Sequence, residues 1–185
     1  SLERLGLTTM SKVVLLAADN AASKACANEL KKNIEQIFGL AKQNIEIKRI
    51  KGLQVHDVKS LKEQGFRELV TTILAYLTDD NLNYQYDLIL NPTGGYKGVI
   101  PFVTVLGMLY GKRSVYIFEH AEQLINLPPL PFSFDIDIYN RVVPALKRID
   151  EQTAIAEQEY YACIIDYTEQ EKPLFTSFIE PIGDN

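Results

Sequence analysis

The chain alternates short, almost uniformly apolar runs with longer stretches in which apolar residues recur every three or four positions. Residues 12–18 (KVVLLAA) and 86–91 (YDLILN) are short apolar runs, a pattern typical of strands buried on both faces of a parallel sheet. Residues 45–50 (IEIKRI) alternate between apolar and polar positions, which indicates a strand nearer the sheet edge. Residues 114–120 (SVYIFEH) complete the set of predicted strands.

Helical periodicity lies between these strands. Between Asn20 and Gly39 an apolar residue recurs about every four positions; Asn20 is a candidate N-cap and Gly39 ends the predicted helix. Residues 58–77 carry a second apolar stripe of helical spacing. Residues 99–110 form a third helix that is apolar on almost every side and ends at Gly111.

The regular alternation of strand and helix predicts an α/β fold, with a Rossmann-like, mostly parallel sheet and helices on both faces. We assign this domain to residues 12–134, because the segment INLPPLPFSFDID contains three prolines and marks a boundary. Residues 135–185 are predicted to form a short C-terminal helical appendage or connector. Residues 1–11 are interpreted as a linker or a non-native remnant.

Composition narrows the candidate functions. A net charge of −5 argues against broad binding to duplex nucleic acid, which relies on many cationic contacts to phosphate, but it permits a small anionic ligand in one local pocket. The two cysteines and two histidines have no zinc-like spacing, so we expect neither a metal nor a cofactor. The apolar tract 99–110 is too short to span a membrane, and we expect a cytoplasmic protein, with a membrane segment outside this chain left open.

In an open α/β sheet, ligands bind beyond the carboxyl ends of the strands. This rule converts the predicted strands into candidate ligand-binding residues. The first strand delivers Asp19, Asn20 and Ser23; the third delivers Asn91, Thr93, Gly94, Gly95 and Lys97; the fourth delivers Glu119 and His120.

The third group, in the sequence NPTGGYK, has the chemistry of an anion pocket. Two adjacent glycines near a helix start expose backbone N–H groups, and the helix dipole adds partial positive charge. Lys97 adds a full charge, while Asn91 and Thr93 add hydrogen-bonding groups, so the loop suits phosphate. A glycine-rich turn with a solvated lysine is the alternative; the position at the end of a buried strand favours binding. The loop is neither a Walker motif nor a dinucleotide fingerprint.

The other two groups are less specific. The first loop is equally compatible with a helix cap and with a ligand contact, and the two roles do not conflict. Ser23 has no neighbouring base in sequence that would make it a nucleophile. Glu119 can accept a ribose hydroxyl, but an exposed position at a strand end explains it as well.

The helix predicted over residues 99–110 needs cover on the side that does not face the sheet. Either the C-terminal appendage or a second copy of the chain can supply that cover. A twofold partner would set two NPTGGYK loops side by side.

Four segments in order, NPTGGYKGVIPF, LGMLYGK, VYIFE and LPPLP, resemble the CARF family, the CRISPR-associated Rossmann fold. The similarity is to the group in which an N-x-T-G-G-x-K motif follows a core strand, and it covers about residues 12–135. The segment VVLLAADNAASKACANEL at the first strand adds a less specific match.

This resemblance implies a homodimeric sensor of type III CRISPR antiviral defence that binds cyclic oligoadenylate, with cyclic tetra-adenylate as the expected ring. The ring is expected across the dimer twofold axis, over the carboxyl ends of the strands. The resemblance also implies an attached effector, which we expect to lie outside this chain. The sequence contains no R-x-x-x-x-H motif of a HEPN ribonuclease and no zinc deaminase signature. It assigns phosphate and ribose contacts to Asn91, Thr93, Gly94, Gly95 and Lys97, and a ligand-facing loop to Asp19, Asn20 and Ser23.

Three functions remain open at this point. The first is a sensor that binds cyclic oligoadenylate and allosterically switches an effector. The second is a ring nuclease, in which Lys97 stabilises the transition state while a ribose 2′-hydroxyl attacks the adjacent phosphate. No general base is evident, so we expect no enzymatic activity beyond slow ring cleavage. The third is a regulatory α/β domain that binds another nucleotide.

Overall fold

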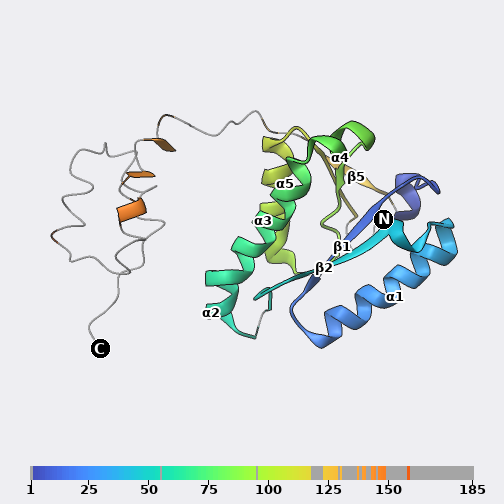
Figure 1. The fold of residues 1–185 in the computed structure, drawn as a ribbon, viewed down its shortest axis with the longest axis horizontal. Coiled ribbons are helices and arrows are strands. Elements are labelled where there is room, and N and C mark those ends of the chain that lie inside the picture. Colours follow the sequence, from blue (N-terminus) through green and yellow to red (C-terminus); the bar gives the residue numbers. More distant parts are fainter. Residues whose placement is uncertain are drawn as a thin grey trace. The chain divides into compact units, whose positions relative to one another are not determined.

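The computed structural model describes residues 2–54, 56–94, 96–117 and 123–128, with Leu130 and isolated positions beyond it. The chain divides into two units, Ser1–Phe132 and Ser133–Asn185. The described elements belong to the first unit, which is an α/β fold as predicted (Figure 1). The predicted appendage, residues 135–185, lies almost wholly outside the described residues, and so do Gly95 and Glu119.

The first half of this unit is a parallel β-α-β arrangement. Strand β1 (Val13–Ala18) leads into helix α1 (Ala21–Phe38), which returns the chain to strand β2 (Ile45–Ile50). The two strands pair in parallel from Val13↔Ile45 to Ala18↔Ile50. Gly39 ends α1 in the left-handed conformation, with φ of 64°, and its N–H donates to the Glu35 carbonyl.

The second half repeats the pattern with a shorter strand. Strand β3 (Ile89–Leu90), a 3₁₀ turn (Lys97–Val99), helix α5 (Ile100–Leu109) and strand β4 (Arg113–Tyr116) follow one another. Strand β4 pairs in parallel with β3 and antiparallel with β5 (Ile125–Leu127). The described strands form two hydrogen-bonded sheets, β1-β2 and β3-β4-β5, with no ladder between β1 and β3.

A long helical segment joins the two halves. Helix α2 (Val58–Ser60), a π-helical turn (Leu61–Gly65) and helix α3 (Phe66–Leu77) run without interruption over residues 58–77, the predicted range. Helix α4 (Asp80–Gln85) follows at once, which the sequence analysis missed. Asp79, which directly follows the predicted helical range, is the N-cap of α4: its carboxylate accepts from the Leu82 N–H at 3.0 Å.

The helices cover both faces of the strands. Helix α1 lies on one side, and α3 and α5 lie together on the other (Figure 1). Each side has its own apolar cluster, as expected for a sheet buried on both faces. The α1 side contains Val13, Ile34, Leu40 and Ile45, and the other side contains Ile50, Leu53, Leu69, Ile73, Leu77, Val103 and Leu106.

Helix α5 is anchored through one face. Val103, Leu106 and Gly107 are buried, and a Cβ at Gly107 would collide with Ser114 Oγ, so the glycine lets α5 approach β4 closely. Phe102 stacks on Phe66 of α3 with ring centroids 4.7 Å apart. Other apolar side chains of α5 and its C-cap are partly exposed: Phe102 39%, Val105 41%, Leu109 38% and Tyr110 41%. Whether a further partner covers them stays a prediction.

Candidate functional site

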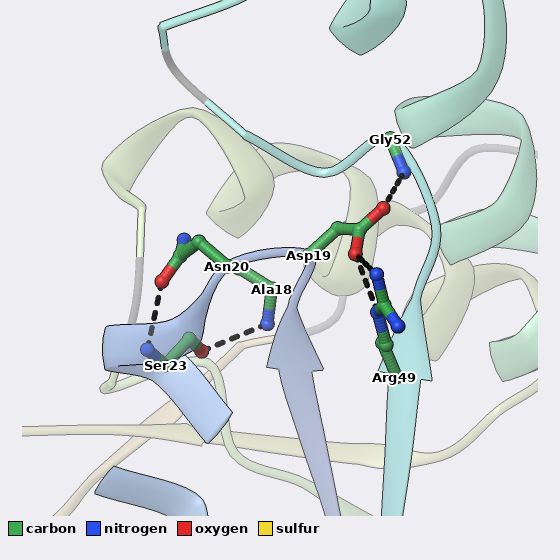
Figure 2. A network of polar contacts seen from close by, with 6 residues as sticks. All are labelled: Ala18, Asp19, Asn20, Ser23, Arg49 and Gly52. Atoms are coloured by element: carbon green, nitrogen blue, oxygen red, sulfur yellow. Dashed lines mark hydrogen bonds and ion pairs between the residues drawn. The ribbon is translucent and has the colours of Figure 1, made fainter. Parts of the chain in front are cut away.

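The loop after β1 is a hydrogen-bonded helix cap. The Asn20 side-chain carbonyl accepts from the Ser23 N–H at 2.7 Å, which caps α1 as predicted. The Ser23 hydroxyl accepts from the Ala18 N–H at 2.9 Å and so joins the first turn of the helix back to the strand (Figure 2). These bonds hold Asn20 and Ser23 in structural roles within the chain.

Asp19 is held from the neighbouring strand. Its Oδ1 accepts from both Nε and Nη2 of Arg49, and its Oδ2 accepts from the Gly52 N–H at 3.0 Å (Figure 2). The Gly52 bond and the Arg49 guanidinium hold the pKa of this carboxyl below its ordinary value, against a smaller desolvation effect. Asp19 is therefore an anion at neutral pH, and both of its oxygens have protein donors.

The loop after β3 is shaped by Thr93. The Thr93 hydroxyl donates to Asn91 Oδ1 at 2.6 Å, and the Thr93 N–H donates to the same oxygen at 3.3 Å. The hydroxyl oxygen in turn accepts from the Ile117 N–H at 3.1 Å, directly after β4. Thr93 thus ties together the segments that leave two parallel strands, so that its side chain defines the loop.

Beyond Thr93, the loop is open at Gly94. Gly94 is exposed, and a Cβ added to it would meet no atom within 4 Å. Lys97 is exposed and begins the 3₁₀ turn, so three residues separate the loop from the first residue of α5. The glycine pair therefore does not lead directly into the helix, and the local N–H groups matter more here than the dipole of α5.

One hydrogen bond joins the two loops. Asn20 Nδ2 donates to the Tyr96 hydroxyl at 3.2 Å, across 76 positions of sequence. Tyr96 is half-buried and packs against the apolar cluster on the α3–α5 side. The structure therefore brings the first-strand and third-strand candidates together. Glu119 and Gly95 fall outside the described residues, so their predicted roles stay predictions.

The comparison with protein families bears directly on this arrangement. The family described as CRISPR-associated protein (Cas_APE2256) matches residues 1–130, which include β1 to β5 and both loops. The chain belongs to this CRISPR-associated family. The match bears out the CRISPR association and supports a CARF-type domain. No curated protein sequence matches the chain.

For this CRISPR-associated domain, sequence reasoning missed three residues of the site: Arg49, Gly52 and Tyr96. Arg49 is the penultimate residue of β2, and Gly52 follows in the turn with φ of 71°. A basic residue and a glycine at a strand's carboxyl end were the available signals. Tyr96 occupies a position that the N-x-T-G-G-x-K motif leaves unspecified, so only its hydrogen bond to Asn20 reveals its part.

The charges in this region suit an anion. Arg49 is near the end of β2, Lys51 follows that strand, and Lys97 follows the glycine loop. The carboxylate of Asp19 is already engaged by protein donors. Among the described residues there is no group of three or more His, Cys, Asp or Glu side chains placed to hold a metal ion. In the same part of the chain, no helix combines the length and apolarity that crossing a bilayer requires.

Proposed function

We propose that this CRISPR-associated domain is a cyclic oligoadenylate sensor of a type III CRISPR accessory effector, with cyclic tetra-adenylate as the preferred ring. One observation carries the proposal: the Asn20–Tyr96 hydrogen bond joins the N-cap of α1, directly after β1, to the glycine-containing loop after β3. In this proposal, backbone donors, Lys97 and Arg49 form one anion-binding region. The resemblance of NPTGGYK to the CARF motif supports a phosphodiester ligand there.

The loop after β3 supplies the phosphate contacts in this proposal. The Asn91 and Thr93 side chains hydrogen-bond to each other, and Thr93 also accepts from the Ile117 N–H. In this proposal they shape the loop rather than hold the ligand. The ligand contacts fall to the backbone around Gly94 and to Lys97. An exposed backbone N–H and an ammonium group both form charge-assisted bonds to phosphate oxygens.

A homodimer forms the complete site in this proposal. The exposed apolar stripe of α5, with Phe102, Val105 and Leu109, supports a second copy of the chain as its cover. A twofold axis near this helix would bring two loops onto one ring. Ring binding then biases the relation between the protomers, and an effector outside this chain responds.

The test combines calorimetry with product analysis. Cyclic tetra-adenylate is titrated into the full chain, and the eluted nucleotide is analysed by liquid chromatography after prolonged incubation. We expect saturable binding near one ring per two chains and intact ligand. Linear tetra-adenylate is the control, because it has the same bases and nearly the same charge without the closed ring.

Two outcomes would contradict the sensor. No heat with cyclic tetra-adenylate or larger rings would exclude cyclic oligoadenylate recognition. Complete conversion to linear products with 2′,3′-cyclic phosphate ends would make the domain a ring nuclease instead. Light scattering on the same sample tests the dimer, and Val105→Glu, on the exposed face of α5, is expected to produce monomers that no longer bind.

A further inference from the structure

Arg49, near the end of β2, is held by the carboxylate of Asp19. Its Nε and Nη2 nitrogens donate to Asp19 Oδ1, yet its side chain is 69% exposed (Figure 2). So exposed an ion pair contributes little to the free energy of folding. The Asp19 contact leaves the hydrogens on Nη1 unused, and a guanidinium can engage a second anion through them.

Asp19 is itself fixed, so it can fix Arg49 in turn. Only 17% of the Asp19 side chain is exposed, and its second oxygen accepts from the Gly52 N–H at 3.0 Å. The Asp19 N–H also donates to the Leu53 carbonyl at 3.1 Å. A guanidinium oriented by such an anchored carboxylate loses less conformational entropy when it binds an anion.

The contacts run in one row from β2 to the loop after β3. Arg49 contacts Asp19, the next residue Asn20 contacts Tyr96, and Lys97 follows Tyr96 in the chain. Cationic residues therefore stand at both ends of this row, with Arg49 and the exposed Lys51 at one end and Lys97 at the other. In this chain of contacts a neutral asparagine and tyrosine stand between the cations, an order that fits two distinct phosphates rather than one.

A twofold-symmetric ligand with four phosphates presents two inequivalent phosphates to each protomer. The loop after β3 accounts for one of them. We propose that Arg49 binds the second phosphate of the ring, and that Asp19 is a positioning residue that orients the Arg49 guanidinium instead of contacting the ligand. This inference rests on the proposed function, since it assigns a further subsite to the same ligand.

The test measures binding of cyclic tetra-adenylate by the full-length chain and its variants. Arg49→Ala is expected to weaken binding at least about tenfold, the size of one charge-assisted hydrogen bond to phosphate. It should also flatten the dependence of log Kd on log salt. Lys48→Ala is the matched control: it removes one cation from the neighbouring position of β2, where Lys48 pairs with Glu46 at 2.9 Å. We expect that control to bind like wild type.

Asp19 is tested by a double-mutant cycle. Asp19→Asn keeps the shape of the side chain, and we expect it to weaken binding several-fold when Arg49 is present and to have no further effect in Arg49→Ala. A purely structural role would weaken binding by the same factor in both backgrounds. Tighter binding by Asp19→Asn alone would likewise overturn the positioning role, because it would mean that the carboxylate merely repels the ligand.

The outcomes separate this inference from the proposed function. If wild type binds the ring and Arg49→Ala binds it equally well, the Arg49 subsite is wrong while the sensor stands. If wild type does not bind any cyclic oligoadenylate, both are wrong. Arg49→Gln guards against a folding defect, because the amide can still donate to Asp19 but carries no charge; full affinity in that folded variant would also overturn the inference.

Discussion

The loops after β1 and β3 leave equivalent positions, each at the carboxyl end of a strand with a parallel neighbour, but they use their polar groups differently. In the first loop, Asp19, Asn20 and Ser23 all hydrogen-bond to the chain itself (Figure 2). In the second, Thr93 donates to the Asn91 side chain and accepts from the Ile117 N–H. Gly94 in the same loop is exposed, with open space around it.

The contrast separates residues that build a site from residues that contact a ligand. Side chains engaged on every oxygen by protein donors must break those bonds before they can serve a ligand, at a cost of about 1 kcal/mol each. Exposed backbone requires no such exchange. In the proposed site, the first loop therefore supplies structural support and the second supplies the ligand contacts, with Tyr96 joining the two.

The largest expected effect comes from the support of the first loop. A Cβ on Gly65, in the π-helical turn, would lie 2.6 Å from the Gly52 carbonyl oxygen, and Gly52 donates to Asp19. The new Cβ would collide with backbone atoms, and neither backbone segment can move aside without a large cost in free energy. We expect Gly65→Ala to lower the free energy of unfolding by about 3 kcal/mol in urea denaturation.

Gly98→Ala is the matched control, because a Cβ there meets no atom within 4 Å. It should change the free energy of unfolding by less than about 0.5 kcal/mol. If Gly65→Ala proved as stable as Gly98→Ala, the Gly52 turn would be free to move, and the first loop would not be rigidly supported.

The next largest effect is on ligand binding by the second loop, with no change in the stability of the fold. Gly94 has open space around it and is not among the glycines with positive φ, so Gly94→Val should unfold like wild type. If ligand rests on this backbone, the new side chain collides with it, and we expect cyclic tetra-adenylate binding to weaken at least about a hundredfold. The sequence predicts the same loss for Gly95→Val. Near wild-type affinity in both folded variants would mean that no phosphate contacts the glycines.

A smaller loss is expected from the charge beside the glycines. Lys97→Ala should weaken binding about tenfold per site with an unchanged melting curve, because one charge-assisted bond to phosphate is removed. Raising the salt concentration should reduce this difference, since an exposed ammonium is screened while shielded backbone donors are not. Calorimetry at low and high salt measures both. Equal affinities for wild type and variant at low salt would make Lys97 a solvated surface charge.

The bond between the loops should have an effect of about 1 kcal/mol on stability. Asn20→Ala removes both the cap of α1 and the bond to Tyr96, and we expect the free energy of unfolding to fall by about 1 to 2 kcal/mol. Tyr96→Phe removes the second bond alone and should have a smaller effect. If Tyr96→Phe also weakened ligand binding more than Asn20→Ala did, the Tyr96 hydroxyl would be a ligand contact rather than a structural link.

Long elements of this fold follow from sequence because their periodicity and caps agree. The bounds of β2 and of the helical segment 58–77 match the prediction, α1 lies between the predicted caps Asn20 and Gly39, and β1 begins one residue later than predicted. Helix α4 was missed because an aspartate can break one helix and cap the next, and only the Asp79–Leu82 bond distinguishes the two. Strand β5 was missed because it is three residues long and precedes a proline.

The site was predictable only at the level of its chain segments. The rule that ligands lie beyond strand ends selected both loops. It did not reveal that Asp19 pairs with Arg49, because their 30-residue separation is closed by the parallel pairing of β1 with β2. Nor did it reveal that the Thr93 hydroxyl accepts a hydrogen bond from the N–H of Ile117, 24 positions away. Such assignments depend on tertiary contacts, which no local pattern encodes.

The smallest effect concerns the ionisation of Asp19. The Gly52 N–H and Arg49 lower the pKa of this carboxyl from its ordinary value of 3.8. A group whose folded pKa is depressed stabilises the fold above its unfolded pKa, and that contribution is lost as pH falls through the folded pKa. The difference in unfolding free energy between wild type and Asp19→Asn should therefore be constant from about pH 5 to pH 7 and shrink below the ordinary value. Urea titrations of both proteins across this range measure it. A difference that did not shrink at acid pH would show that the Asp19 charge adds nothing to the support of the first loop, and the contrast between the loops would then rest on the Asn20 and Ser23 bonds alone.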